Sequence, residues 1–438
     1  MMRTGEKKMR RFYRLGGVMA FVMALAGLTA SCSGSAGTGR VTSDGATGGD
    51  GGDGGTVLAP PPPSGLASVN NDTTFQATSI SILDPNGGVL RPDCVDSKPP
   101  NGGVIPLIST DVVMPSQPQR GGGLVLIDRG NGVLTSIDPT TCQVTRQNIV
   151  PGAGGAKTNP HDLVTIADHK AYVTRYQPNP AATSPSQMGN DVAVIDPTTG
   201  AFVSRIDVDA YASTVPGTTI LARPNRAIIA GGRIIVSLNE ADASYKTYGD
   251  GQVIVIDPAT DTVVASVTLT GRNDCEGMDY VASTQTLMVA CGGTYLAANQ
   301  ALQSGIAVVD LGSSPPSVTK TMTGAAFGNQ PVNFSWVLAA PPAGGGTRAF
   351  AGTNDPNLVA PDVLFSFDYL LGTTTQLATS APYSIGPSAA TASLLLVPEF
   401  LGSSPKIQLF DITGTPQATT AFAPDTVNNL SPVQVAWY

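Results

Sequence analysis

Charged residues are scarce in this chain of 438 residues, at 13% against roughly 25% in an average soluble domain. Lysine and arginine number 24 against 32 aspartates and glutamates, so the formal net charge is −8. This shortage of basic residues excludes the clustered positive surface that nucleic acid requires, and no nucleic-acid partner is expected. The apolar share of 41% is, in turn, too high for a disordered chain.

Histidine and tryptophan are nearly absent, with two residues of each. The sequence also lacks a Gly-x-Ser-x-Gly motif, a phosphate-binding loop and a haem-attachment motif, so no catalytic residue is predicted. No Cys-x-x-Cys pair and no Cys/His cluster is present, and therefore neither a metal site nor a cofactor is expected. Whether the chain is an enzyme stays open at this stage.

The first 31 residues have the pattern of an export signal. Basic residues up to Arg14 precede an uncharged stretch at 15–30, which is short for a membrane span. The small residues before Cys32 resemble the lipobox of bacterial lipoproteins, although Thr29 stands where that pattern usually has leucine. The resemblance implies that residues 1–31 are a signal peptide and that Cys32 is lipidated; the alternative is an ordinary secretory signal.

Residues 32–65 are predicted to be a flexible tether that begins at the lipidated cysteine. They are rich in glycine, aspartate and proline and cannot bury apolar surface. Residues 66–438 would then form a single domain. We therefore expect a chain anchored by its lipid in the bacterial cell envelope, with the outer membrane favoured and the domain in the periplasm or at the cell surface.

One short phrase recurs along the sequence: two apolar residues, an aspartate, and in most copies a proline followed by threonine or glycine. The aspartates of its copies are Asp84, Asp138, Asp196, Asp257, Asp310, Asp368 and Asp411. Each copy is typical of a strand ending in a tight turn, because aspartate caps the turn and proline fixes φ. A hairpin of two strands precedes the best copies and a further strand follows, so the unit is four antiparallel strands, A to D.

Repeated units of this kind are typical of β-propeller blades. The repeat resembles the YVTN-type propeller family over roughly residues 110–438, most clearly in the three blades around 160–320. We predict an all-β, seven-bladed β-propeller with mostly four strands a blade; six or eight blades are the alternatives. Residues 432–438 are predicted as a strand A without successors, and 78–83 and 88–95 as strands C and D without a strand A. Their pairing would close the ring with the C-terminal strand.

The connections from strand B to strand C are long and open on the same face as the starts of the A strands, where extra residues commonly bind ligands. The strand starts bring polar groups to the expected channel rim: His161, Asp162, Arg223, Asn225, Arg226, Asp274, Glu276, Asn333 and Gln434. The loops carry Tyr176, Asn239, Glu240, Asp242, Tyr245 and Tyr295, and three of their tyrosines offer flat surfaces for stacking. The alternative, which is favoured for any single residue, is that these groups only solvate the channel mouth and cap strand ends.

This face favours a scaffold that binds an unidentified polar ligand or protein, with the membrane as a further partner through the lipid. The alternative is a metal-dependent lyase or hydrolase at the channel rim. Its candidate residues would be His161, Asp162, Asp274 and Glu276. They fall in two blades that are not neighbours, which argues against a compact catalytic site.

Four cysteines remain besides Cys32, and an even number in an exported chain indicates disulfides. Cys275 and Cys291 lie at the open end of one predicted hairpin, so they are expected to pair. Cys94 and Cys142 lie near the D strands of neighbouring blades and form the second expected pair.

Overall fold

A computed structural model describes residues 58–438. Residues 73, 75, 99–107, 151–157, 342–345 and 402–403 are left out of it, and for 416–420 only the backbone is described. The proposed signal peptide, Cys32 and most of the tether lie outside the described residues. Leu58–Tyr438 form one compact unit. No helix in the described ranges is long and apolar enough to cross a membrane.

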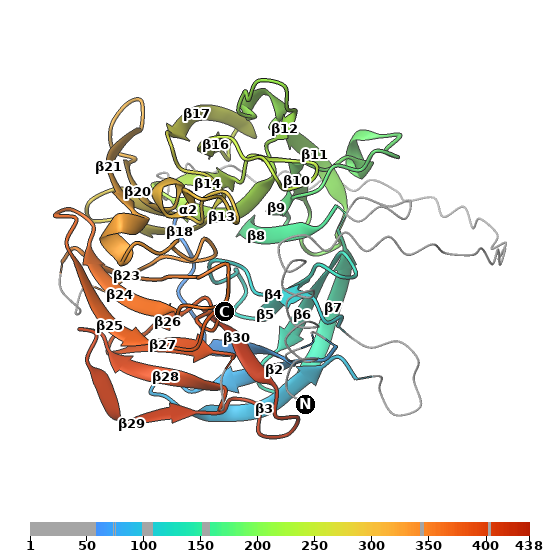
Figure 1. The fold of residues 1–438 in the computed structure, drawn as a ribbon. Helices are drawn as coiled ribbons and strands as arrows, with labels where there is room; N and C mark the ends of the chain where they lie inside the picture. The colour runs from blue at the N-terminus through green and yellow to red at the C-terminus, as the bar shows by residue number, and fades with distance from the viewer. Residues whose placement is uncertain are drawn as a thin grey trace, which may run out of the picture. The chain divides into compact units, whose positions relative to one another are not determined.

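Seven sheets of four antiparallel strands stand around a ring in this unit, which confirms the predicted propeller (Figure 1). From the inner to the outer strand, blade 1 is β30 (Ser431–Trp437), β1 (Leu66–Asn71), β2 (Thr78–Leu83) and β3 (Val89–Asp96). Blade 2 is β4 (Val112–Val113), β5 (Leu124–Asp128), β6 (Val133–Asp138) and β7 (Gln143–Ile149). Blade 3 is β8 (Pro160–Ala167), β9 (Lys170–Arg175), β10 (Asp191–Ile195) and β11 (Phe202–Asp207).

The remaining four blades follow in chain order. Blade 4 is β13 (Pro224–Ala230), β14 (Arg233–Leu238), β16 (Gly251–Asp257) and β17 (Thr262–Leu269), and blade 5 is β18 (Cys275–Val281), β19 (Thr286–Cys291), β20 (Gly305–Asp310) and β21 (Ser317–Thr323). Blade 6 is β22 (Leu338–Ala339), β23 (Arg348–Gly352), β24 (Val363–Asp368) and β25 (Thr374–Thr379). Blade 7 is β26 (Ala389–Ala390), β27 (Leu394–Glu399), β28 (Lys406–Asp411) and β29 (Pro416–Phe422).

The C-terminal strand closes the ring, as the sequence predicts. β30 takes the inner place of blade 1 and pairs antiparallel with β1, with Leu66 opposite Trp437. The sequence analysis did not identify β1, because half of its six residues are polar although all six are buried. Asn70 is accommodated there by donating to Ser81 Oγ at 2.8 Å. The backbone N–H of Tyr438 donates to the carbonyl of Gly65 at 2.9 Å, so the two ends of the ring meet directly.

The core lies between the blades. Each of the seven apolar clusters found among the described residues is built from two adjacent blades, so the clusters occupy all seven junctions. Successive side chains of a strand point to opposite faces of the sheet. Ile234 and Val236 of β14 accordingly pack toward blade 3, and Ile235 packs toward blade 5. Inner strands covered on both faces are therefore apolar at successive positions.

The repeated aspartates end strand C or follow it directly in every blade. Each carboxylate accepts a hydrogen bond of 2.7–2.9 Å from the backbone N–H two residues further on, which caps the turn into strand D. The seven donors are the N–H groups of Asn86, Thr140, Thr198, Ala259, Gly312, Leu370 and Thr413. The sequence signal therefore had a local physical cause that is present in all seven blades.

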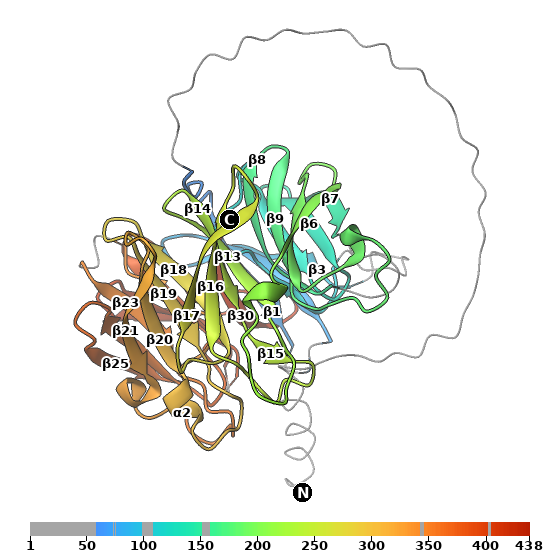
Figure 2. The same cartoon turned by 90° about the horizontal axis from the view of Figure 1, so that it is seen from above.

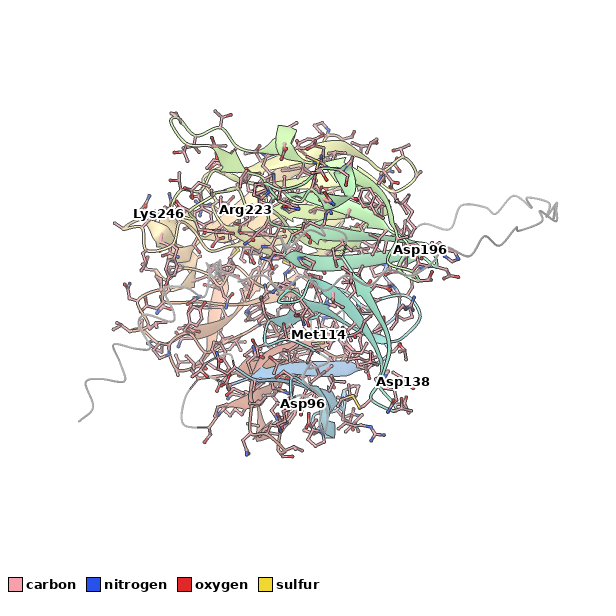
Figure 3. All side chains as sticks on the ribbon, turned by 90° about the vertical axis from the view of Figure 1, so that its right-hand side faces the viewer. Asp96, Met114, Asp138, Asp196, Arg223 and Lys246 are labelled. Atoms are coloured by element: carbon pink, nitrogen blue, oxygen red, sulfur yellow. A yellow bond between two sulfur atoms is a disulfide. The ribbon has the colours of Figure 1, made fainter. Side chains whose placement is uncertain are left out.

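These turns define one face of the propeller, the turn face, and the long B–C connections define the opposite one, the loop face. Figure 3 shows Asp138 and Asp196 on one side of the molecule and Arg223 and Lys246 on the other. On the loop face, β12 (Ile220–Leu221) pairs with β15 (Ala241–Asp242), and the short α2 (Gln300–Gln303) lies in the loop of blade 5. Figure 2 shows α2 and β15 at the same end of the unit.

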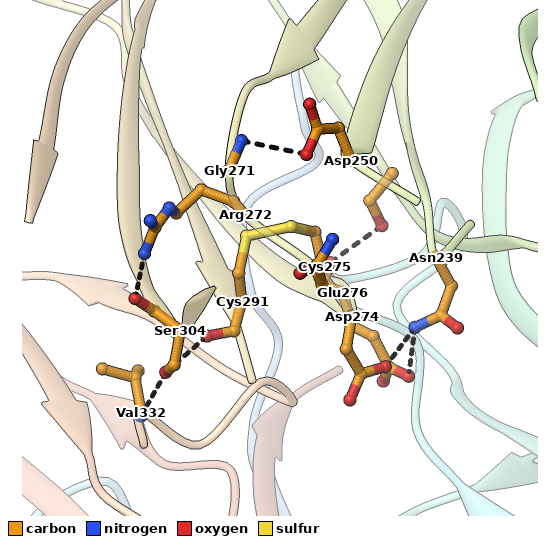
Figure 4. The surroundings of a disulfide bond; sticks show 12 residues. Asn239, Asp250, Gly271, Arg272, Asp274, Cys275, Glu276, Cys291, Ser304 and Val332 are labelled. Carbon is orange, nitrogen blue, oxygen red and sulfur yellow. Dashed lines mark hydrogen bonds between the residues drawn. A yellow bond between two sulfur atoms is a disulfide. The ribbon is translucent and has the colours of Figure 1, made fainter. Parts of the chain in front are cut away.

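Both expected disulfides are present. Cys94 joins Cys142 across blades 1 and 2, and Cys275 joins Cys291 within the inner hairpin of blade 5 (Figure 4). The second bridge is packed against the backbone of blade 4. A Cβ atom on Gly251 would lie only 2.4 Å from the sulfur of Cys275, so glycine is required at this contact.

Candidate functional site

The propeller channel contains a segment of blade 2 that runs below the loop face. After β4, residues 114–119 follow the inner edges of blades 3 and 4. Gln117 forms two hydrogen bonds with the backbone of Ile229, and Gln119 bonds the backbone of Leu163 and Thr165. Ile229 and Leu163 lie on inner strands beyond the starts of those strands. The segment therefore lies across the channel beneath the loop-face starts of these strands, and we call the group of side chains at those starts, above the segment, the cup.

Three parallel aromatic rings stand at the mouth of this cup. The His161 ring stacks on Tyr176 with centroids 4.2 Å apart, and Tyr176 stacks in turn toward Tyr245 at 6.3 Å. The guanidinium of Arg223 lies over both tyrosine rings and donates to Tyr245 Oη at 2.9 Å. Tyr176 is 6% exposed with neighbours on both ring faces. It positions His161 and is not the open stacking surface that the sequence suggested.

His161 is held in a neutral form that leaves one ring nitrogen unbonded. Its Nδ1 lies 3.0 Å from Asn225 Oδ1. Burial, and then the positive charge of Arg129, lower the pKa of His161 well below its ordinary value. A neutral ring that donates from Nδ1 leaves Nε2 as an acceptor. No described residue bonds that Nε2.

An acid pair from blade 5 lies beside Asn225. Asn239 donates from Nδ2 to Asp274 Oδ1 at 2.6 Å and to Glu276 Oε1 at 3.2 Å, so one amide bridges the two carboxyl groups (Figure 4). Burial raises the pKa of Glu276 to about 7, which the charges of Arg226 and Arg129 oppose. Burial and the charge of Glu276 raise the pKa of Asp274 well above its ordinary value. Glu276 is therefore close to its midpoint at neutral pH, and Asp274 holds its proton more tightly than an ordinary aspartate.

Arg226 lies between these groups on the inner strand of blade 4. The residue is 8% exposed, and its Nε is buried without a hydrogen-bond partner. Its charge acts on Asp162 and His161 in blade 3 and on Glu276 in blade 5. Among the residues that the structure describes, its guanidinium forms neither a hydrogen bond nor an ion pair.

The structure thus brings His161, Asn225, Arg226, Asp274 and Glu276 together through blade 4, which separates blades 3 and 5. The sequence argument against a compact site did not include the amides of Asn225 and Asn239 that span this gap. Asp162 lies beneath the group and has a structural role: it accepts hydrogen bonds from Ser116 and from the backbone N–H of Ala227.

Other predicted residues lie apart from this cluster. Gln434 bonds the backbone of Met114, and Asn333 donates to the carbonyl of Ile385 and lines a separate cleft of about 150 Å³ between blades 6 and 7. Asp242 caps its own loop by accepting from the N–H of Lys246. Tyr295 lies further out, with its hydroxyl donating to the carbonyl of Pro356.

Glu240 lies behind the mouth and is fully buried. It accepts the N–H of Ser213, and burial raises its pKa to about 8. Its Oε1 has no hydrogen-bond partner.

Sequence reasoning missed Arg129, which follows strand B of blade 2. Arg129 is paired with Asp111 at 2.5 Å, yet its charge acts on both His161 and Glu276. Arg129 begins the short B–C connection of blade 2, residues 129–132, whereas the sequence analysis considered only the long B–C loops. The segment 114–119 was also missed. Within the described ranges, no group of three or more His, Cys, Asp or Glu residues is placed to hold a metal ion.

The fold and this mouth define a seven-bladed propeller with a polar cup on its loop face. No protein-family model matches the chain, and no curated protein matches it in sequence. Among solved structures, it is similar to a putative 6-phosphogluconolactonase from Bacteroides uniformis, with a TM-score of 0.51 and 13% identity over 86% of this chain and 100% of the other. A putative 6-phosphogluconolactonase from Bacteroides fragilis gives a TM-score of 0.48 and 11% identity over 86% and 98%. These likenesses concern the fold alone.

Proposed function

We propose that this chain is a binding propeller that recognises a polar ligand or a protein segment through its loop face. The observation that carries the proposal is the convergence of His161, Asn225, Arg226 and Glu276, from three blades, on one mouth that holds an unpaired buried cation. The turn face differs, because its seven repeated aspartates are all used to cap turns. Binding sites on propellers and other repeat scaffolds commonly occupy the face with the longer connections.

The proposal includes the location expected from the sequence. An export signal, lipidation at Cys32 and a YVTN-type repeat would together make the chain an envelope-anchored lipoprotein. Two disulfides are compatible with an oxidising compartment outside the cytoplasm. Replacing Cys32 by alanine and following the protein through membrane fractionation tests the anchor.

Photo-crosslinking in intact envelopes tests which face binds. Val359 in the B–C loop of blade 6 is 74% exposed, and Leu371 in the C–D turn of the same blade is 73% exposed. A photoreactive amino acid at position 359 should give specific adducts, and the same group at 371 should not. Equal or stronger adducts at 371 would show that the loop face was the wrong choice.

Acid–base catalysis is the second candidate function, and the acid pair favours it. Two neighbouring carboxyl groups with differently raised pKa values can divide the roles of acid and base. The enzyme that the sequence suggested as an alternative, a metal-dependent lyase or hydrolase, requires a divalent ion at the rim. Titration calorimetry with Ca²⁺, Mg²⁺, Mn²⁺ and Zn²⁺ tests it: saturable binding that is lost in Asp274→Asn would favour catalysis over simple binding.

A further inference from the structure

The guanidinium of Arg226 has no acceptor among the described residues of the mouth. A buried charge without a partner is costly, and the usual compensation is an ion of opposite sign. Arg226 is 8% exposed with Nε unbonded, whereas Arg129 is paired with Asp111, and Arg223 donates to the backbone carbonyls of Ala241 and Asp242. Of the three arginines at the mouth, Arg226 alone lacks an acceptor among the described residues.

The carboxylate beneath Arg226 cannot serve as that acceptor at short range. Asp162 already accepts four hydrogen bonds at 2.5–3.0 Å: two from the N–H and the hydroxyl of Ser116, and two from the N–H groups of Leu163 and Ala227. It forms no ion pair with Arg226 in the described structure. The guanidinium thus lies between blades 3 and 5, close enough for its charge to act on His161 and Glu276.

We propose that the cup binds a small hydroxylated carboxylate, whose carboxylate group pairs with Arg226 and whose hydroxyl donates to Nε2 of His161. This inference rests on the proposed function and adds the class of ligand. Guanidinium binds carboxylate through two parallel hydrogen bonds, and a neutral imidazole with a free nitrogen accepts from a hydroxyl. The amide of Asn225 holds the imidazole in that tautomer.

The charge around Arg226 favours a monoanion over a phosphate. Arg226 is the guanidinium at the mouth without an acceptor among the described residues, and its charge acts on the carboxyl groups of Glu276 and Asp162. A carboxylate neutralises Arg226, whereas a doubly charged phosphate would add a negative charge beside Glu276. Like charges at this range in a buried site are unfavourable.

Binding should therefore depend on the protonation of Glu276. The charged and titratable groups that face it are Asp274 on its own strand, Arg226 of β13, Arg129 after β5, and Tyr176 and Tyr248 of the neighbouring loops. With a pKa of about 7, Glu276 is neutral in weak acid and ionised in weak base. An ionised Glu276 repels the ligand, so affinity falls as pH rises through about 7, by about tenfold from about pH 6 to about pH 8 if only the neutral form binds.

The two histidines of the chain provide the test, because His161 lies in the cup and His169 lies beside Asp196 on the turn face. The full-length protein, labelled with ¹⁵N in histidine, is titrated with acetate, D-galacturonate, D-galactose and inorganic phosphate. Acetate and galacturonate should shift the His161 ring signals saturably and leave His169 unchanged, and galacturonate should bind more tightly. Galactose, which lacks the carboxylate, should leave both rings unchanged, and phosphate should bind more weakly than acetate.

Three variants complete the test. Arg226→Gln should abolish the His161 response, Arg226→Lys should weaken it while keeping the charge, and Glu276→Gln should remove the pH dependence. An unchanged His169 signal and melting temperature show that each variant is folded. No response of His161 to acetate, or an undiminished response in Arg226→Gln, would overturn the inference. Crosslinking at position 359 would then still support the proposed function, so the two failures are distinguishable.

Discussion

Arg175 carries a full charge at a position with no solvent exposure. Its Nε and Nη2 donate to the two oxygens of Asp191 at 2.7 Å each, and its Nη1 donates to the carbonyl of Ser186 at 2.7 Å. Arg205 forms an ion pair with the same carboxylate, its Nε lying 2.9 Å from Oδ2 of Asp191. This network fixes the B–C loop of blade 3, and with it Tyr176, which supports His161.

Replacing Arg175 by methionine should destabilise the fold by about 3–5 kcal/mol, because it leaves Asp191 buried with only one partner. Guanidinium-induced unfolding measures the change. The matched control is Arg205→Met, whose side chain is 15% exposed and whose loss leaves Asp191 its bidentate partner. That variant should lose clearly less stability; equal losses in both would contradict this account.

The sequence predicted which residues lie at the mouth, but it did not predict which of them contact one another. Asp274 and Glu276 were identified because strand A starts near the channel, which follows from the repeat. The bridge through Asn239 could not be foreseen, since it joins residues of different blades whose register along the channel depends on bulges such as that between Cys275 and Met278. A repeat in the sequence fixes spacing within blades and does not fix side-chain contacts between them.

At the level of elements, the hairpin of β18 and β19 joins the disulfide to the mouth. Cys275 lies between Asp274 and Glu276 in the chain, and its bridge to Cys291 restrains the start of strand A (Figure 4). Gly277, two residues on, lies against the backbone of Trp336 in blade 6, where a Cβ atom would be 2.5 Å away. The strand that carries the acid pair is thus restrained on both sides.

Removing this bridge with Cys275→Ala and Cys291→Ala should lower stability by about 3 kcal/mol, the entropy cost expected for its sequence separation of 16. The control is the pair Cys94→Ala and Cys142→Ala, whose separation of 48 predicts a larger loss of about 4 kcal/mol. Denaturant unfolding gives both values. A larger loss for the shorter loop would mean that strain or residual structure outweighs loop entropy.

The segment 114–119 shows why one element escaped prediction. Pro115 and Pro118 interrupt any strand after Val113, because proline lacks the N–H that a ladder requires. Side-chain amides bond the inner edges there: Gln117 at Ile229, Gln119 at Leu163, and Gln434 at Met114. No strand periodicity marks this arrangement, so the repeat predicted blade 2 without indicating the segment beneath the cup.

The whole molecule depends on closure between its first and last strands. Residues of β30 contribute to the apolar clusters on both sides of blade 1, through Val435 toward blade 7 and through Tyr438, directly after it, toward blade 2. A sheet edge left bare at β1 would open both junctions. The ring is therefore a cooperative unit whose last junctions form only when the C-terminal strand is present.

A circular permutant tests this closure. Tyr438 joined to Gly65 by a short glycine linker, with new ends between Thr198 and Thr199 in an exposed turn, should keep its stability within about 2 kcal/mol, because short loop closure changes the free energy little. Deleting residues 431–438 should instead abolish the cooperative unfolding transition. Circular dichroism during denaturation compares the two proteins, and a truncated chain as stable as the parent would show that closure contributes nothing.

The chain enters the propeller on the turn face. Leu66 is opposite Leu83, which directly precedes the turn at Asp84, and the N–H of Ser64 donates to the carbonyl of Tyr438 on that side. If the proposed lipid at Cys32 holds the chain to a membrane, the predicted tether joins the propeller on the face opposite the long B–C loops. Anchoring and ligand binding would then use different faces of the propeller, so the tether would not compete with a ligand for the loop face.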